Sequence, residues 1–231
     1  MASVAGHLVH QLEGAGVRHI YGIVGDSLNP VVDAVRRSKK IRWIHVRHEE
    51  TAAFAAAAEA EITGQLAVCA GSCGPGNLHL INGLYDANRS HLPVLAIASH
   101  IPTSQIGTGF FQETHPDRIF DECSVFSEMI SSSEQVPRVT RSAIQQALSN
   151  HGVAVLTLPG DIADMEVSGN LPDTITSPRP ARVVPNMEDV QGLADAINRD
   201  SLRRCRCPRR PRPHYGIGGT SQGSGGALPA W

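Results

Sequence analysis

The stretch IRWIHVRHEETAAFAAAAEA occupies residues 41–60 and contains two different periodicities. Residues 41–46 form a short, mostly apolar run, which is typical of a β-strand. The alanine-rich residues that follow are typical of a helix that packs closely against a neighbour. A strand that leads directly into a helix is the repeating unit of a parallel α/β sheet, so this stretch predicts that architecture.

Glu49 and Glu50 lie where the helix is expected to begin. Acidic residues are favoured in the first turn of a helix, where they interact with the positive end of the helix dipole. A carboxylate in a mostly apolar setting can also share a proton with a bound heterocycle. The spacing alone is compatible with both interpretations.

The same alternation of strand and helix extends along most of the chain. Apolar runs predict six strands, near residues 19–24, 41–46, 65–70, 93–98, 124–130 and 153–158. Helical patterns lie between them, and the helix over 134–150 is expected to be capped by Ser132 or Ser133. The predicted fold is therefore α/β: a doubly wound, mostly parallel six-stranded sheet with helices on both faces, followed by a linker and a disordered tail.

Composition predicts four segments. Residues 1–167 hold the α/β pattern, and residues 168–186 are a linker rich in proline, serine and threonine. Residues 187–200 begin another domain with a helix that is expected to end near Arg199. Residues 201–231 cannot build a core and are expected to be disordered.

Three interpretations of this tail remain open. Its arginines could form a basic arm for an acidic partner. Cys205 and Cys207 could bind a metal, although no second ligand pair has suitable spacing. The abundance of arginine, proline, glycine and cysteine also matches GC-rich codons that are read out of frame, and this is the interpretation that we favour.

Composition also excludes several classes of protein. The net charge of -2 and the aromatic content of 4% argue against nucleic-acid binding. No apolar run approaches the roughly 18 residues of a membrane helix, and the first residues lack the basic region of a secretory signal. The scattered cysteines suit reduced thiols, so a cytoplasmic protein is expected.

The turn from Gly71 to Asn77 follows a predicted strand and opens a helix. Its glycines allow a ligand to approach the backbone, although a purely structural turn is equally compatible. The turn lacks both the Walker A ending and the spaced glycines of a dinucleotide-binding loop. His45, His48 and Glu49 lack the HExxH spacing, so no metal site is expected there.

Three segments together are more specific than any one of them. Residues 16–27, 47–50 and 70–77 resemble the N-terminal, pyrimidine-binding domain of thiamine-diphosphate enzymes. Residues 100–102, 109–116 and 158–161 are most similar to the pyruvate oxidase branch, the quinone-linked pyruvate dehydrogenases. The resemblance covers about residues 4–200, and residues 1–167 would then be the pyrimidine-binding domain.

The resemblance implies specific roles for residues. Glu49 would hydrogen-bond a ring nitrogen of the cofactor's aminopyrimidine and act as a proton relay. Gly25, Ser72, Pro75, His79 and Gln112 would line the cofactor, and Phe111 and Gln112 would face the substrate and the flavin. For His79 an ordinary polar position on a helix surface remains open, and for Phe111 plain core packing remains open.

The resemblance also implies an activity. Enzymes of this branch decarboxylate pyruvate oxidatively to acetate and carbon dioxide with thiamine diphosphate, Mg²⁺ and FAD, as homo-oligomers with the cofactor at a subunit interface. The domains that hold Mg²⁺ and most of the flavin are missing here, so we expect a truncated, frameshifted chain with little activity of its own. Acetolactate synthase, another 2-keto acid decarboxylase, and a non-catalytic dimerisation or interaction module are the alternatives.

Overall fold

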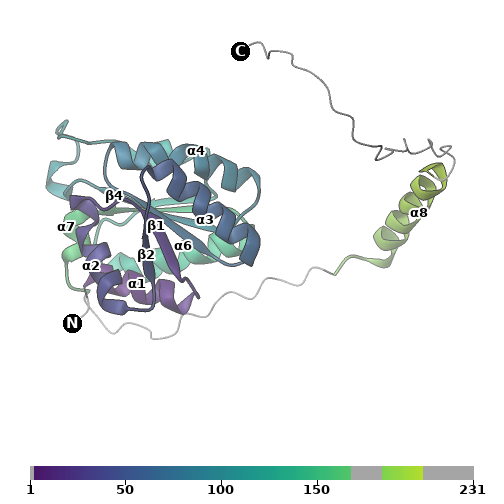
Figure 1. The fold of residues 1–231 in the computed structure, drawn as a ribbon, viewed down its shortest axis with the longest axis horizontal. Coiled ribbons are helices and arrows are strands. Elements are labelled where there is room, and N and C mark those ends of the chain that lie inside the picture. Colours follow the sequence, from purple (N-terminus) through teal and green to yellow (C-terminus); the bar gives the residue numbers. More distant parts are fainter. Residues whose placement is uncertain (1–2, 168–183, 205–231) are drawn as a thin grey trace, which may run out of the picture. The chain divides into compact units, whose positions relative to one another are not determined.

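The computed structural model describes residues 3–167 and 184–204, which belong to two separate units (Figure 1). The first unit holds the sheet, and the second holds a single long helix. Most of the expected linker, residues 168–183, lies outside the described residues, as does the expected tail from residue 205 onward.

The first unit is built on one six-stranded sheet in which every pair of neighbouring strands is parallel (Figure 1). The strands are β1 (His19–Gly22), β2 (Arg42–His45), β3 (Ala67–Gly71), β4 (Val94–His100), β5 (Phe126–Met129) and β6 (Val153–Pro159). Their order across the sheet is β2-β1-β3-β4-β6-β5, so β2 and β5 are the edge strands, and the chain returns from each of them to a strand nearer the centre, β3 or β6. The predicted doubly wound α/β fold is confirmed.

The described part of this unit contains seven helices. They are α1 (Val4–Gly14), α2 (Asn29–Ser38), α3 (Glu49–Thr63), α4 (Pro75–Arg89), α5 (Pro116–Ile119), α6 (Val136–Asn150) and α7 (Gly160–Asp164), of which α1 precedes the first strand and α7 follows the last. Three short 3-10 turns accompany them: η1 (Asp26–Leu28), η2 (Thr103–Gln105) and η3 (Ser133–Gln135). The alanine-rich α3 begins where His48 accepts a hydrogen bond from the Glu50 N–H, and it ends at Gly64 in the left-handed conformation.

The prediction that Ser132 or Ser133 caps a helix over residues 134–150 was wrong. Ser132 and Ser133 lead into η3, and α6 begins only at Val136, after Gln135, with no side-chain cap. Pro137 explains the shift, because its fixed φ and missing N–H suit the first turn of an α-helix. The Gln135 side chain instead accepts hydrogen bonds from the backbone N–H and the hydroxyl of Ser131.

The two faces of the sheet are covered by different helices (Figure 1). These helices contribute different side chains to the two faces. Helices α1, α2, α6 and α7 contribute valine, leucine and isoleucine to one buried cluster, which we call the aliphatic face. Helices α3 and α4 cover the other face, where α3 supplies five buried alanines and α4 supplies Leu80, Leu84 and Ala87, and we call it the alanine face. Alternate residues of β3, β4 and β6 point to the two faces, as expected for strands buried on both sides.

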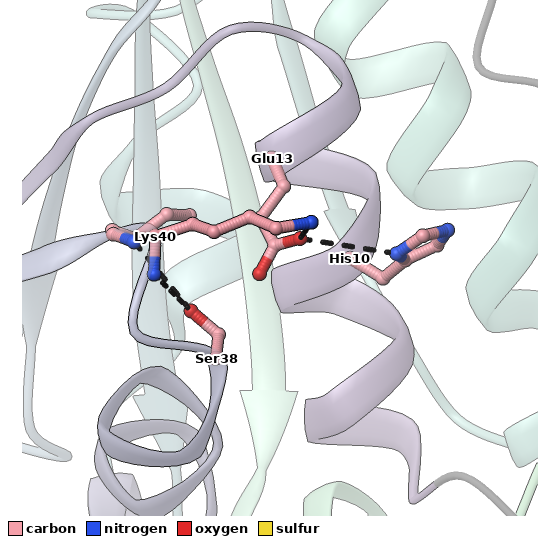
Figure 2. A network of polar contacts seen from close by, with 5 residues as sticks. His10, Glu13, Ser38 and Lys40 are labelled. Carbon is pink, nitrogen blue, oxygen red and sulfur yellow. Dashed lines mark hydrogen bonds and ion pairs between the residues drawn. The ribbon is translucent and has the colours of Figure 1, made fainter.

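A polar network ties α1 to the turn before β2, at the amino-terminal edge of the sheet (Figure 2). Lys40 Nζ lies 3.2 Å from Glu13 Oε2, and His10 Nδ1 lies 4.0 Å from the same oxygen. Ser38 Oγ accepts a hydrogen bond from the Lys40 N–H at 3.3 Å. Exposed pairs of this kind contribute at most about 1 kcal/mol each, so the network positions the turn more than it stabilises the fold.

The second unit contains α8 (Met187–Arg204). The Asn186 side chain caps its first turn by accepting a hydrogen bond from the Asp189 N–H at 2.8 Å. The helix runs past Arg199, where its end was expected, and includes the first four residues assigned to the tail. The first proline after it is Pro208, so no helix breaker lies in between. No helix among the described residues is long and apolar enough to cross a membrane.

Candidate functional site

The loops at the carboxyl ends of the strands enclose a cavity of about 370 Å³. Open α/β sheets bind ligands at this edge. The cavity is lined by Glu49 and by Val24, Gly25, Asp26, Ser27, Ser72, Cys73, Pro75, Gly76 and Gln112. Five of the residues that the family resemblance pointed to therefore meet in one place: Gly25, Glu49, Ser72, Pro75 and Gln112.

Glu49 is the first residue of α3 and is buried, with 8% of its surface exposed. Its Oε2 accepts a hydrogen bond from His79 Nδ1 at 3.1 Å. Its Oε1 lies on the side of Gly76, where an added Cβ would come within 3.3 Å of that oxygen. Within residues 3–167 and 184–204, no hydrogen bond reaches Oε1. Glu49 thus keeps one acceptor atom for a ligand in the cavity.

His79 does not line the cavity itself but contacts Glu49 from α4. Its ring stacks on that of His48, with the ring centroids 4.3 Å apart and the planes at 26°. The neighbouring Glu50 turns the other way and accepts a hydrogen bond from Asn82 at 2.8 Å. The two adjacent acids are therefore distinguished, and only Glu49 belongs to the cavity.

Ser27 connects its own loop to the glycine turn after β3 and to the end of β4, a role that the sequence did not reveal. Its hydroxyl lies 3.0 Å from Ser72 Oγ and accepts a hydrogen bond from the Cys73 N–H at 3.1 Å. Its carbonyl accepts a hydrogen bond from Ser99 Oγ at 2.6 Å. Asn77, buried in α4, donates to the Ser99 carbonyl at 2.7 Å. The only available signal was the Gly25-Asp26-Ser27 turn, since its place after β1 puts it at the ligand-binding edge.

Gly74 and Gln112 bring the glycine turn against the loop that follows β4. Gly74 has φ of +68°, and a Cβ there would lie 2.8 Å from the Cβ of Gln112. The Cys73 thiol donates to Gln112 Oε1 at 3.4 Å. Gln112 also has a positive φ, 64°, which is rare for a residue other than glycine. Such a conformation persists only where the surroundings hold it.

A second, larger cavity of about 750 Å³ lies on the other side of Ser27, Cys73 and Gln112. Phe111 lines it and is 79% exposed, so the alternative that Phe111 is a core residue was wrong. His100 lines it at the end of β4 and is buried. Desolvation lowers the pKa of His100, and the nearby Glu113 and Asp117 oppose that shift.

Two carboxylates hold the loop between β4 and α5, which carries Phe111 and Gln112. Glu113 accepts hydrogen bonds from the backbone N–H groups of Gly107, Gly109 and Phe110. Asp161 of α7 accepts bonds from both the N–H and the hydroxyl of Thr103. The backbone bonds, chiefly that from Gly107, lower the pKa of Glu113. Nothing in the linear spacing of these residues indicated such a clamp.

From the sequence, we considered His45, His48 and Glu49 as a possible metal site. The structure gathers His79 instead, and ligand atoms of His48, Glu49 and His79 all lie within 4.8 Å of one another. His79 is 30 positions from Glu49 and reaches it only because α3 and α4 pack together.

Residues 2–119 match the family described as thiamine pyrophosphate enzymes, N-terminal TPP binding domain. The chain belongs to this family. Thiamine pyrophosphate is another name for thiamine diphosphate, so the resemblance deduced from the motifs is confirmed.

Three relatives illustrate the range of the family. The chain is 56% identical over 196 residues to an uncharacterized 42.6 kDa protein of Pseudomonas amyloderamosa, covering 84% of this chain and 50% of that protein. It is 37% identical over 224 residues to pyruvate oxidase of Lactiplantibacillus plantarum, covering 94% of this chain and 35% of the oxidase. It is 34% identical over 186 residues to acetolactate synthase of Mycobacterium bovis, covering 76% of this chain and 30% of the synthase.

The chain thus spans half or less of the length of these relatives. Because 94% of 231 residues is about 217, the match with pyruvate oxidase extends beyond residue 200, where the resemblance of the motifs ended.

The residues of the smaller cavity fit the pyrimidine part of the cofactor. Glu49 Oε1 offers an acceptor to a ring nitrogen that carries a proton, and Gly76 leaves room beside this oxygen. None of the described residues that line this cavity is basic, so none of their side chains could form an ion pair with the diphosphate. The cavity therefore suits the uncharged ring and not the charged tail.

Proposed function

We propose that this chain supplies the pyrimidine-binding half of a thiamine-diphosphate site in an enzyme that decarboxylates pyruvate oxidatively to acetate and carbon dioxide. The observation that carries the proposal is the position of Glu49. Its carboxylate is buried at the start of α3, anchored through Oε2 by His79, and open to the cavity through Oε1.

Each residue has a definite task in this proposal. Glu49 binds the pyrimidine through Oε1 and holds a proton at the ring nitrogen, while His79 fixes the orientation of the carboxylate. Val24, Pro75 and Gly76 line the cavity beside Glu49 and would contact the bound ring. When bound, the cofactor supplies an electron sink for decarboxylation.

The remaining parts of the site would come from elsewhere. We infer that the diphosphate and its Mg²⁺ bind on other domains or on a partner subunit, and the lack of basic side chains among the described cavity residues supports this. We also propose that residues 1–167 form the pyrimidine-binding domain, that residues 168–186 are a linker, and that α8 begins the next domain, which would contribute to FAD binding. The enzyme would be a homo-oligomer that acts on pyruvate.

Pyruvate oxidation is favoured over acetolactate synthesis by two observations. The match with pyruvate oxidase covers 94% of the chain at 37% identity, against 76% at 34% for the acetolactate synthase. Phe111 and Gln112 stand at the larger cavity, on the side that the resemblance assigns to substrate and flavin. Acetolactate synthase is the second candidate because it shares the glutamate and the glycine turn.

Binding of thiamine to the isotope-labelled chain tests the role of Glu49. We expect thiamine to shift the NMR amide signals of Gly25, Glu49 and Gly76. Glu49→Gln should weaken binding at least about tenfold, because a hydrogen bond to a charged group contributes about 1.5–3 kcal/mol. Glu50→Gln is the matched control and should bind like the unchanged chain. Equal loss in both variants, or no thiamine-dependent shift, would overturn the proposal.

Product analysis separates the two candidate activities. With pyruvate, thiamine diphosphate, Mg²⁺, FAD and an artificial quinone, we expect this chain alone to form almost no product. The complete enzyme that carries this domain should release acetate. Acetolactate as its main product would favour the second candidate, and substantial acetate from the chain alone would contradict the assignment of half a site.

A further inference from the structure

The structure assigns a second ligand to the pair Glu49–His79: we propose that His48, Glu49 and His79 bind one divalent transition metal, of which Zn²⁺ is the best match, and that this metal excludes thiamine. The proposal starts from the gathering of their ligand atoms within 4.8 Å of one another. The metal site itself does not depend on the proposed function, because metal binding is a property of the three side chains alone. The exclusion of thiamine rests on the proposed function.

The ligand set favours zinc. Two imidazoles and one carboxylate, with a fourth position left open, form a recurrent ligand set of zinc sites. Imidazole also suits copper and nickel, whereas Mg²⁺ prefers oxygen ligands and keeps most of its waters. A site with two nitrogen donors should therefore discriminate strongly against Mg²⁺.

The geometry is close to what a metal needs. With Zn–N and Zn–O bonds near 2.0–2.2 Å, ligand atoms of a tetrahedral site lie about 3.3 Å apart. Glu49 Oε2 and His79 Nδ1 are already 3.1 Å apart, joined by a proton that the metal would replace. His48 must turn from its stacked position on His79 and release its hydrogen bond with the Glu50 N–H.

The surroundings permit this rearrangement. The side chains of His48 and His79 are about half exposed, so their rings can rotate and a hydrated ion can reach them. Glu49 is held by α3 and is the buried member of the trio. Glu50 lies 3.8 Å from His48 and adds a second negative charge near the site.

The consequence is competition at one carboxylate. A metal on Oε2 would replace His79 as the anchor of Glu49 and draw the carboxylate toward the mouth of the cavity. The same group would then be unable to accept the proton of a pyrimidine nitrogen. Zinc is thus expected to reduce thiamine binding, whereas Mg²⁺ at the same concentration is not.

Isothermal titration with ZnCl₂ tests the site directly, in the full chain with Cys205→Ser and Cys207→Ser, so that these thiols do not take zinc. We expect one zinc per chain, and at least a tenfold loss of affinity in His48→Ala and in His79→Ala. His45→Ala is the matched control, because His45 is a nearby histidine outside the trio, and it should bind like the parent. Far-ultraviolet circular dichroism checks that each variant is folded.

A second titration measures the competition. Thiamine replaces thiamine diphosphate here, because a diphosphate chelates zinc in solution. Saturating zinc should weaken thiamine binding at least tenfold, and MgCl₂ should leave it unchanged. Unchanged zinc affinity in both histidine variants, or equal binding of Mg²⁺ and Zn²⁺, would overturn the metal site. Zinc and thiamine bound together would overturn the exclusion. Zinc binding without any thiamine binding would support the metal site and contradict the proposed function.

Discussion

The aliphatic face and the alanine face of the sheet have different roles in the same domain. On the aliphatic face, large side chains of α1 and α6 fill the space above the strands and bury much apolar area. On the alanine face, small side chains bury less area but let α3 and α4 approach each other closely. Glu49 and His79 come from these two helices. The aliphatic face therefore mainly supplies stability, and the alanine face mainly sets the geometry of the site.

The largest expected effect on stability comes from breaking the aliphatic face. Leu12 of α1 is fully buried, so Leu12→Ala removes buried methyl groups and leaves a cavity. We expect a loss of about 2–5 kcal/mol in the free energy of unfolding, measured in urea. Thiamine affinity of the folded fraction should not change. Ile62→Ala, at a position that is 83% exposed, is the control and should change stability by less than about 0.5 kcal/mol.

The next effect comes from forcing the alanine face apart. A Cβ on Gly83 of α4 would lie 2.5 Å from the Cβ of Ala53 and 2.8 Å from the backbone nitrogen of Phe54 in α3. Gly83→Ala should therefore cost about 1–3 kcal/mol and also weaken thiamine binding, because the helices that hold Glu49 and His79 must separate.

Gly192→Ala in α8 is the matched control for this substitution. Its Cβ meets nothing within 4 Å, and it should stabilise its helix by up to about 1 kcal/mol. If Gly83→Ala left both stability and thiamine binding unchanged, close packing would not be what positions the site.

A third, local effect concerns the loop that carries Phe111 and Gln112. Glu113→Ala should speed amide hydrogen exchange at Gly107, Gly109 and Phe110 at least about tenfold, because one carboxylate holds all three groups. The lowered pKa of Glu113 means that the clamp is complete above its ordinary value of 4.5 and is lost as pH falls through the lower folded value. Glu128→Gln on β5 is the control. Equal acceleration of exchange at Gly107, Gly109 and Phe110 in this variant would argue against the clamp.

The smallest effect is the pH dependence contributed by His7 on the aliphatic face. Burial, helped by His10, lowers the pKa of His7 below 6.5. Below pH 6.5 the unfolded chain therefore binds a proton that the folded chain does not. As the pH is lowered, the free energy of unfolding falls by at most about 1.4 kcal/mol per pH unit. His7→Gln should flatten this slope between pH 7 and pH 5.5 in urea unfolding, whereas the exposed His45→Gln should not.

Much of the fold could be predicted because it depends on local patterns. Each of the six apolar runs became a strand. The three central strands β3, β4 and β6 are buried at every position, as their continuous apolar segments predict. The cap before α6 was missed because the sequence allows both a 3-10 turn and an α-helical turn after Ser132. Glu49 was identified from its motif, and the structure accounts for the choice over Glu50 by burying only Glu49.

By itself, the sequence determined the order of strands and helices, the family, and the acid on which the proposed function depends. It did so because apolar periodicity and short motifs act over a few neighbouring residues. Only the tertiary structure decided that His79 anchors Glu49, that Ser27 connects the glycine turn to the end of β4 and that Glu113 holds the loop after β4. Apart from the short-range clamp of Glu113, these contacts join residues 30 or more positions apart, and the packing of α3 on α4 and of neighbouring strands brings them within hydrogen-bonding distance.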